Sequence, residues 1–315
     1  MRILVLGGTN FIGRHIVETL RGSEDVTVLN RGTQSVPGDD VVQLTADRTA
    51  PASVAEVLTI GFDAVVDVSG TEPEHIASTA PVLRALGVSR YTFISSGSVY
   101  DSRTTKAPFP ETSTIEGDPI WGEYGRAKVE CERLLSECGF EELTVLRPPY
   151  VYGPGNSEPR EQFLWSRLLQ GKSIFVPGDG STTIQFCHVS YLAEVVLAAC
   201  RGQFEPGVYN VGDEHGLSFD SYIACLAKAA GLPVTGVSHV LDPRIPARDY
   251  FPFRNYSLVL ETSKIAAATS HAIAAIPLAE GLARTYDWFQ AHDPLDYVPT
   301  PREEELADGA DITHP

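Results

Sequence analysis

Two short stretches of the chain carry side chains that can move a proton to or from a bound molecule. YGRAK, at 124–128, places the phenol of Tyr124 four residues before the ammonium of Lys128, and SSGSVY, at 95–100, offers hydroxyl groups. On a helix this spacing puts Tyr124 and Lys128 on one face, where the ammonium stabilises the phenolate and lowers a pKa that is about 10 in the free side chain. These residues predict an acid and base at Tyr124, with a serine hydroxyl holding the substrate oxygen.

The first 31 residues predict the element that would hold a cofactor beside these groups. An apolar strand over Ile3–Leu6 is followed by a glycine turn, a helix and a second apolar strand over Val26–Leu29. In such a β-α-β unit the turn directs backbone N–H groups and the positive end of the helix at one point, which suits a pyrophosphate. The residues that we expect to contact a dinucleotide here are Gly7, Thr9, Asn10, Phe11, Ile12 and Gly13.

The glycine spacing itself is incomplete. Gly7 permits the tight turn and Gly13 the close approach of helix and strand, but Asn10 stands where the pattern has its middle glycine. Asn also adopts left-handed backbone conformations, so we expect it to replace that glycine. The position between an apolar strand and a helix favours dinucleotide binding over a purely structural turn.

The ends of the following strands predict how the rest of the dinucleotide is bound. After the second strand the chain has Asn30-Arg31 and no carboxylate; a guanidinium pairs well with a 2′-phosphate, so we expect NADP in preference to NAD. Other residues at the carboxyl ends of strands are expected to line the same crevice. They are Asp47, Arg48, Ser69 and Pro149, together with Tyr124 and Lys128.

Strand and helix patterns alternate along the first half of the chain. Apolar strands over 41–44, 64–68, 91–95 and 143–146 are interspersed with helices near 51–58, 72–86 and 124–138. This order predicts an α/β fold with a doubly wound parallel Rossmann sheet. We expect a smaller, interleaved substrate-binding lobe after the proline-rich and glycine-rich segment 147–156. The predicted division is 1–152 and 185–213 for the NAD(P)-binding domain, 153–184 and 214–297 for the lobe, and 298–315 for an acidic, mobile tail.

The composition of the chain indicates which partners and which cellular compartment to expect. The 315 residues carry a formal net charge of −17, so the surface as a whole would repel nucleic acid and anionic membranes. Five cysteines are present, without a C-x-x-C pair or a histidine cluster at zinc spacing, so we expect no metal site and a reducing compartment. No apolar run reaches the ~18 residues of a membrane span. We therefore expect a cytoplasmic protein without a membrane partner.

Six motifs occur in the order found in the extended short-chain dehydrogenase/reductases: GGTNFIG, SSGSVY, YGRAK, LRPPYVYGPG, FCHVSYLA and VYNVG. The chain resembles this superfamily, which contains nucleotide-sugar epimerases, dehydratases and related reductases, over almost all residues before the tail. The resemblance implies a catalytic triad of Ser96, Tyr124 and Lys128. It also implies a structural role for His188.

Departures from the family pattern narrow the expected reaction. Gly97-Ser98 replaces the Asp-Glu pair of the 4,6-dehydratases, Tyr150 stands where epimerases commonly have Asn, and Ile184 stands where they have a phosphate-binding Arg. We expect hydride transfer at a secondary alcohol or ketone carbon of a small polar substrate, with sugars and nucleotide sugars among the options. Epimerisation through transient oxidation by a bound NAD is the alternative. The residues expected to contact the substrate are Ser98, Tyr150 and, in an arginine-rich segment that suits an anion, Arg248 and Arg254.

An RNA-binding protein is the alternative of another class. FPFR, together with GGTNFIGR and NRG, resembles a branch of the superfamily that contains chloroplast stem-loop RNA-binding proteins. A net charge of −17 makes a basic face hard to build, so we expect a small-molecule partner and no nucleic acid. A nucleotide sensor without catalysis is disfavoured because Ser96, Tyr124 and Lys128 are retained. The resemblance also suggests a homodimer through helices near 72–87 and 123–138.

Overall fold

The computed structural model describes residues 1–36, 38–234, 236–292, 296–308 and 312–313. The chain divides into two compact units, each built from segments that are distant in sequence. The sheet unit consists of Met1–Val151, Cys187–Glu214 and Leu260–Ala275, and the second unit of Tyr152–Phe186, His215–Val259 and Ile276–Pro315. Residues 260–275, which the sequence prediction placed in the second lobe, cluster with the sheet unit, where the short helix α8 (Ser263–Ala268) lies.

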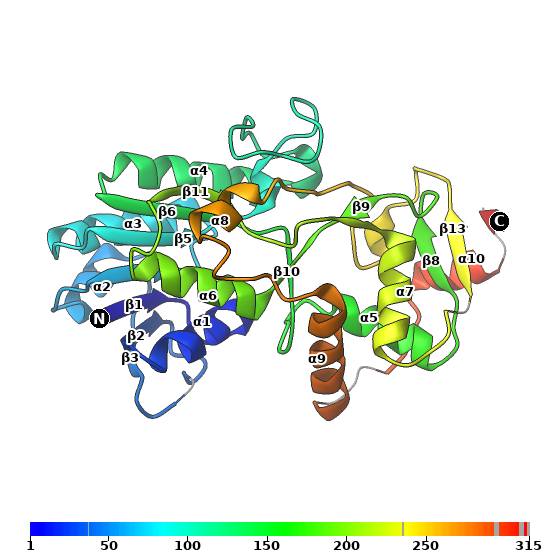
Figure 1. Ribbon diagram of the computed structural model, residues 1–315, viewed down its shortest axis with the longest axis horizontal. Helices are drawn as coiled ribbons and strands as arrows, with labels where there is room; N and C mark the ends of the chain where they lie inside the picture. Colours follow the sequence, from blue (N-terminus) through cyan, green and yellow to red (C-terminus); the bar gives the residue numbers. More distant parts are fainter. Residues whose placement is uncertain (37, 235, 293–295, 309–311, 314–315) are drawn as a thin grey trace. The chain divides into compact units, whose positions relative to one another are not determined.

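The sheet unit contains a seven-stranded parallel sheet (Figure 1). The strands lie in the order β11-β6-β5-β4-β1-β2-β3, so the chain starts in the middle of the sheet and builds outward in both directions. This is the doubly wound fold that the alternating pattern predicted. The strands are β1 (Arg2–Leu6), β2 (Asp25–Asn30), β3 (Val42–Thr45), β4 (Ala64–Asp67), β5 (Arg90–Ile94), β6 (Glu142–Arg147) and β11 (Gly207–Asn210).

Helices cover both faces of this sheet, as Figure 1 shows. The helices α1 (Phe11–Arg21) and α6 (Val189–Cys200) pack on one face, and α2 (Pro51–Val57), α3 (Pro73–Ala85) and α4 (Glu123–Glu137) on the other. Because successive side chains of a strand point to opposite faces, the continuous apolar run of β1 supplies both cores. Ile3 and Val5 belong to the core under α1 and α6, whereas Leu4 and Leu6 belong to the other.

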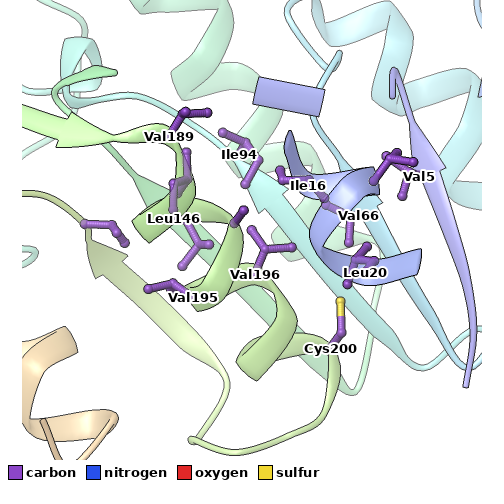
Figure 2. Close-up of a cluster of buried hydrophobic side chains, with 14 of the residues drawn as sticks. Val5, Ile16, Leu20, Val66, Ile94, Leu146, Val189, Val195, Val196 and Cys200 are labelled. Carbon is purple, nitrogen blue, oxygen red and sulfur yellow. The ribbon is translucent and has the colours of Figure 1, made fainter. Parts of the chain in front are cut away.

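Figure 2 shows the first of these cores. Ile16 and Leu20 of α1 and Val195, Val196 and Cys200 of α6 lie over the strand residues Val5, Val66, Ile94 and Leu146. The α1 side chains are spaced at helical intervals, as the sequence predicted. The core therefore fixes the start of α1, and with it the glycine turn, against the carboxyl end of β1.

The second unit packs helices and short strands around an aromatic core. The ring of Phe186 stacks on Tyr222 with centroids 4.3 Å apart, and Phe219 contacts Phe251 edge-on at 4.8 Å.

The helices of the second unit are α5 (Arg160–Leu169), α7 (Phe219–Ala229), α9 (Leu278–Ala291) and α10 (Pro301–Ala307). The remaining strands of the chain are β7 (Tyr150–Tyr152), β8 (Ile174–Pro177), β9 (Thr183–Ile184), β10 (Phe186–His188), β12 (Leu217–Ser218), β13 (Val237–Val240) and β14 (Ile312–Thr313).

The predicted acidic tail differs from the structure over Pro301–Ala307, which forms α10. Thr300 and Glu303 make a capping box, in which the Glu303 carboxylate accepts the Thr300 N–H at 2.7 Å. The same carboxylate pairs with Arg167 of α5 at 2.7 Å, and both side chains are buried. The prediction for 301–307 counted Glu303 as a solvated charge, whereas the structure buries it against Arg167. The rest of the predicted tail falls partly on 309–311 and 314–315, outside the described residues.

No helix in the part of the chain that the structure describes is long and apolar enough to cross a membrane.

Candidate functional site

The glycine turn between β1 and α1 is shaped by two close approaches of backbone. Gly7 has φ +89°, and a Cβ on it would lie 2.5 Å from the Cβ of Ser69. A Cβ on Gly13 would lie 2.0 Å from the carbonyl oxygen of Gly7. Only glycine fits both positions, so the first turn of α1 sits directly against the end of β1. The N-terminus of an 11-residue helix therefore faces the carboxyl edge of the sheet.

Asn10 takes a conformation that the sequence analysis did not predict. It precedes α1 with φ −125° and ψ 146°, which is extended backbone, and the left-handed φ of the turn falls on Phe11 at 27°. Asn10 therefore does not use the left-handed conformation that Asn tolerates, because the turn changes direction one residue later. Phe11 is buried in the core under α1 and α6, and this packing holds its backbone in place.

The carboxyl end of β2 carries Asn30 and Arg31. The Oδ1 of Asn30 accepts hydrogen bonds from the Gly32 N–H at 2.7 Å and from Gln43 Nε2 at 3.0 Å. The Nδ2 of Asn30 is buried and has no hydrogen-bond partner among the described residues. Arg31 is exposed. Asp47 is exposed too, and its pKa is lowered chiefly by hydrogen bonds from Thr49, with a smaller contribution from the charge of Arg31.

Arg48 lies inside the protein, where it does not face the crevice as we expected. The residue is 8% exposed, and its guanidinium grips the carboxylate of Asp67 with two bonds of 2.8 and 2.7 Å. It also donates to Ser69 Oγ at 2.7 Å, and Ser69 Oγ donates in turn to the Leu6 carbonyl at 3.1 Å. Both terminal nitrogens of Arg48 are used within the protein, so Arg48 acts on the cofactor crevice through the segment after β4.

Lys128 is buried at the carboxyl ends of β4 and β5. Its Nζ donates to the carbonyl oxygens of Gly70 at 2.9 Å and Ile94 at 2.7 Å, and it lies 4.6 Å from the ring centre of Phe93. Burial lowers the pKa of Lys128 to about 8, and the nearby carboxylate of Asp67 partly opposes this effect. An ammonium has three N–H donors, so one remains to reach a ligand.

Tyr124 lies one turn before Lys128, in the first turn of α4, and its side chain is 44% exposed. Ser96 follows β5, and its Oγ accepts the N–H of Ser98 at 3.1 Å, which caps the short helix η1 (Gly97–Val99). The two segments touch because Gly125 has no side chain: a Cβ there would lie 2.8 Å from the carbonyl oxygen of Ser98. The structure thus brings the segments that carry Ser96, Tyr124 and Lys128 together.

Two more predicted residues, Ser98 and Tyr150, lie near the contact between the segments that carry Ser96 and Tyr124. Ser98 is 2% exposed, and its Oγ has no hydrogen-bond partner among the described residues. Tyr150, 8% exposed, lies beside Trp121 of the short helix η2 (Pro119–Trp121), with ring centres 6.2 Å apart. The Pro148 carbonyl accepts the Gly97 N–H at 2.7 Å, so the segment that continues into Pro149 and Tyr150 is bonded to the loop that carries Ser96.

His188 lies at the start of α6, where its Nδ1 accepts the Ser190 N–H at 3.2 Å. This is a helix cap, consistent with the structural role that the resemblance implied.

Asp67 and Tyr91 were not predicted as site residues. Asp67 ends β4 with 0% exposure and accepts the Tyr91 hydroxyl at 2.7 Å as well as Arg48. Gly70 holds Lys128 through its carbonyl. The available signal was the charge that closes the otherwise apolar strand AVVD, because a buried carboxylate needs a partner. The partner, Arg48, is nineteen residues away and cannot be read from local pattern.

The predicted arginines Arg248 and Arg254 belong to the second unit. Arg248 lines a pocket there together with Arg160, and Phe163, Tyr250 and Phe251 supply apolar walls. One guanidinium nitrogen of Arg248 donates to the Pro252 carbonyl, which fixes the direction of the side chain. Arg254 is not among the residues that line this pocket. The pocket combines the two guanidinium groups and the carboxylate of Glu158 with aromatic surface.

The sheet unit fits a dinucleotide in three respects. The turn at Gly7 and Gly13 leaves backbone N–H groups and the helix end open to a pyrophosphate. Asn30 Nδ2 is an orphaned donor at the ribose end of such a ligand. Lys128 and the end of β5 offer an ammonium and a hydroxyl at the other end.

Comparison with known proteins gives the same assignment. A family model described as "NAD dependent epimerase/dehydratase family" matches residues 3–212. Chloroplast stem-loop binding protein of 41 kDa b of Arabidopsis thaliana is 30% identical over 91% of this chain and 78% of its own. A 3-diazoavenalumate denitrifying reductase of a Streptomyces species is 28% identical over 74% of this chain and 83% of its own. The NAD complex of UDP-glucose 4-epimerase from Thermus thermophilus superposes with a TM-score of 0.73, at 24% identity, over 93% of this chain and 100% of that one.

Proposed function

Because the chain belongs to the NAD-dependent epimerase/dehydratase family, we propose that it is a nicotinamide-dependent oxidoreductase that transfers hydride at a secondary alcohol or ketone carbon. The observation that carries the proposal is the buried ammonium of Lys128, anchored at the ends of β4 and β5 one helical turn beyond Tyr124. A dinucleotide would lie from the Gly7–Gly13 turn to Lys128, and a bound nicotinamide supplies or accepts the hydride.

The residues of the chain divide the remaining work. Tyr124 exchanges the proton of the substrate oxygen, because the residue is 44% exposed and the ammonium one turn away favours the phenolate. Ser96 orients the same oxygen by a hydrogen bond. Lys128 also binds the ribose hydroxyls through its remaining N–H. Ser98 and Tyr150 border the substrate.

Substitution of the proposed acid and base is the direct test. Tyr124→Phe removes the hydroxyl from an exposed position, so we expect turnover to fall by about 10²-fold or more, the range of general acid–base catalysis, with nucleotide affinity nearly unchanged. Turnover is followed as absorbance of the reduced cofactor in a screen of keto and hydroxy compounds. A variant that retains wild-type turnover excludes Tyr124 as the acid and base.

Epimerisation is the second candidate, supported by the UDP-glucose 4-epimerase that shares the fold. An epimerase regenerates its cofactor in every cycle and gains from retaining it, whereas a reductase must exchange it. If the purified protein carries NAD that stays bound during gel filtration, the result favours an epimerase. Protein that is empty and changes the fluorescence of added NADPH favours the reductase.

NADP preference is the finer part of the proposal and rests on Arg31. Its exposed guanidinium is placed at the end of β2, although the Asp47 carboxylate nearby opposes a 2′-phosphate. We expect Arg31→Ala to weaken NADPH binding by about tenfold and to leave NADH binding within about twofold. An equal effect on both nucleotides would mean that Arg31 does not read the 2′-position.

We also propose that the pocket of the second unit binds an anionic ligand, because the arginines Arg160 and Arg248 both line it and outnumber the one carboxylate there, Glu158. UDP, dTDP and inorganic phosphate serve as probes in calorimetric titrations. Arg248→Met should weaken the binding of any probe that is bound, whereas Arg244→Met, at an exposed arginine paired with Asp242, should not. Equal effects of the two variants on probe binding would mean that this pocket does not bind the anion.

RNA binding, which the Arabidopsis relative brings forward, is not favoured because the net charge is −17. A filter-binding assay with a stem-loop RNA at two salt concentrations tests whether the protein binds RNA.

The predicted homodimer through α3 and α4 is tested by light scattering. The predicted cytoplasmic location agrees with five free cysteines and is tested by fractionation.

A further inference from the structure

The anchor of Lys128 is itself held by a buried charge cluster that the catalytic proposal does not use. Gly70, whose carbonyl accepts the Lys128 ammonium, packs tightly: a Cβ on it would lie 2.8 Å from the Phe93 ring and 2.9 Å from Asp67 Oδ2. The Asp67 carboxylate therefore lies directly against the residue that positions the lysine. Asp67 Oδ1 also accepts the Ser69 N–H at 3.1 Å, which fixes the segment between them.

Arg48 ties this segment to its surroundings. Besides its two bonds to Asp67, the guanidinium donates to Ser69 Oγ at 2.7 Å and to the His75 carbonyl at 3.3 Å. Ser69 in turn packs against Gly7, so the same segment forms one side of the glycine turn and the anchor of Lys128. One ion pair thus holds both ends of the crevice in which a dinucleotide would lie.

The cluster also balances charge around the ammonium. The charged and titratable groups that face Lys128 are Asp67 from β4, Arg48 from the segment after β3, and Cys131 and Glu132 from its own helix. Glu132 is neutralised by Arg147 of β6, with 2.6 Å between Oε2 and Nη2. Asp67 is likewise paired, with Arg48, but among these groups it opposes the effect of burial on the lysine pKa most strongly.

We propose that Asp67 is a positioning residue for Lys128: clamped by Arg48 and Tyr91, it holds the Gly70 carbonyl under the lysine and supplies the negative charge that keeps the buried lysine an ammonium. The consequence for the reaction rests on the proposed role of Lys128 in catalysis. The effect on Lys128 itself does not, and it can be measured without cofactor or substrate.

The chain has five lysines, so NMR of protein labelled with ¹³C at the lysine ε-carbons resolves Lys128 from four others. Lys128→Met assigns its signal. In the wild-type protein we expect the pKa of Lys128 to lie below the ordinary value of a lysine side chain. Asp67→Asn, which removes the negative charge and keeps the shape, should lower the Lys128 pKa by at least about half a unit. Glu142→Gln, which breaks the half-exposed Arg90–Glu142 pair elsewhere on the same sheet, should leave it unchanged.

A smaller shift in Asp67→Asn, or an equal shift in Glu142→Gln, overturns the proposal. If Asp67→Asn does not fold, the double variant Arg48→Met with Asp67→Asn removes both buried charges, a replacement that proteins often tolerate. It should also lower the Lys128 pKa by at least about half a unit, because Asp67 acts more strongly on the lysine than Arg48 does. An unchanged or raised value overturns the proposal.

NADH titrations at several pH values then separate the positioning role of Asp67 from the proposed function of the protein. Loss of the ammonium should weaken NADH binding as pH rises through the Lys128 pKa, and Asp67→Asn should move this loss to lower pH. If the NMR shift occurs but NADH does not bind at any pH, the positioning role stands and the proposed function fails.

Discussion

Substitution of Gly13 by alanine tests whether the glycine turn needs its close backbone contact. The Cβ that alanine adds would lie 2.0 Å from the Gly7 carbonyl oxygen and 3.1 Å from Gly8 Cα, which are backbone atoms. Because such contacts do not occur below 3.0 Å, α1 and the end of β1 must separate by about 1 Å. Overpacking of this kind costs about 1–3 kcal/mol of unfolding free energy.

The same displacement moves the backbone N–H groups of the turn away from the proposed pyrophosphate. We expect Gly13→Ala to weaken NADH binding at least tenfold, which corresponds to about 1.4 kcal/mol. Urea unfolding measures the stability, and NADH fluorescence measures the affinity under conditions where the variant is folded.

Gly22, at the other end of α1, provides the matched control. It has φ −64° and ψ −17°, and a Cβ on it would meet nothing closer than 3.7 Å. Gly22→Ala should therefore be neutral or add about 0.4–1 kcal/mol of stability, with NADH affinity unchanged. Wild-type affinity in Gly13→Ala, or equal damage from both substitutions, would refute the reasoning.

Two further predictions concern stability. Glu303→Ala leaves Arg167 buried without its carboxylate partner, so the free energy of unfolding measured in urea should fall by about 3–5 kcal/mol. Glu305→Ala, at an exposed pair with Arg302, should change it little. Similar unfolding curves for the two variants would mean that α10 is not held by the Arg167–Glu303 ion pair. Burial raises the pKa of Asp213 to about 7, above its value in the unfolded chain, so the native state binds more protons between about pH 4 and 7 and loses stability as pH rises through that window. Asp213→Asn should flatten this dependence, which amounts to about 1.4 kcal/mol per pH unit, and an unchanged pH profile of unfolding would contradict the assignment.

Much of the sheet unit could be predicted because its signals are local. A strand such as Ile3–Leu6, buried on both faces, reads as an unbroken apolar run, and helices such as Glu123–Glu137 show their buried face at helical spacing. The positions of Tyr124 and Lys128 on one face follow from the same periodicity. These features need no knowledge of distant contacts.

The features that were missed depend on contacts between distant residues. Arg48 looks like a crevice residue because it follows β3, but its partner Asp67 withdraws it into the core. Glu303 looks solvated because its neighbours are acidic, but Arg167 buries it, although Thr300-x-x-Glu303 is a capping box that was legible in the sequence. The conformation of Phe11 is set by packing and has no sequence signature.

We propose that the sheet unit binds a nicotinamide dinucleotide between the Gly7–Gly13 turn and Lys128. Calorimetric titration of the purified protein with NADH and NADPH tests it most directly, with Lys128→Met and Arg244→Met as paired variants. We expect one nucleotide per chain for the wild type, weaker binding by Lys128→Met and unchanged binding by Arg244→Met. No binding of either nucleotide to nucleotide-free wild-type protein, or equal binding by wild type and Lys128→Met, would contradict it.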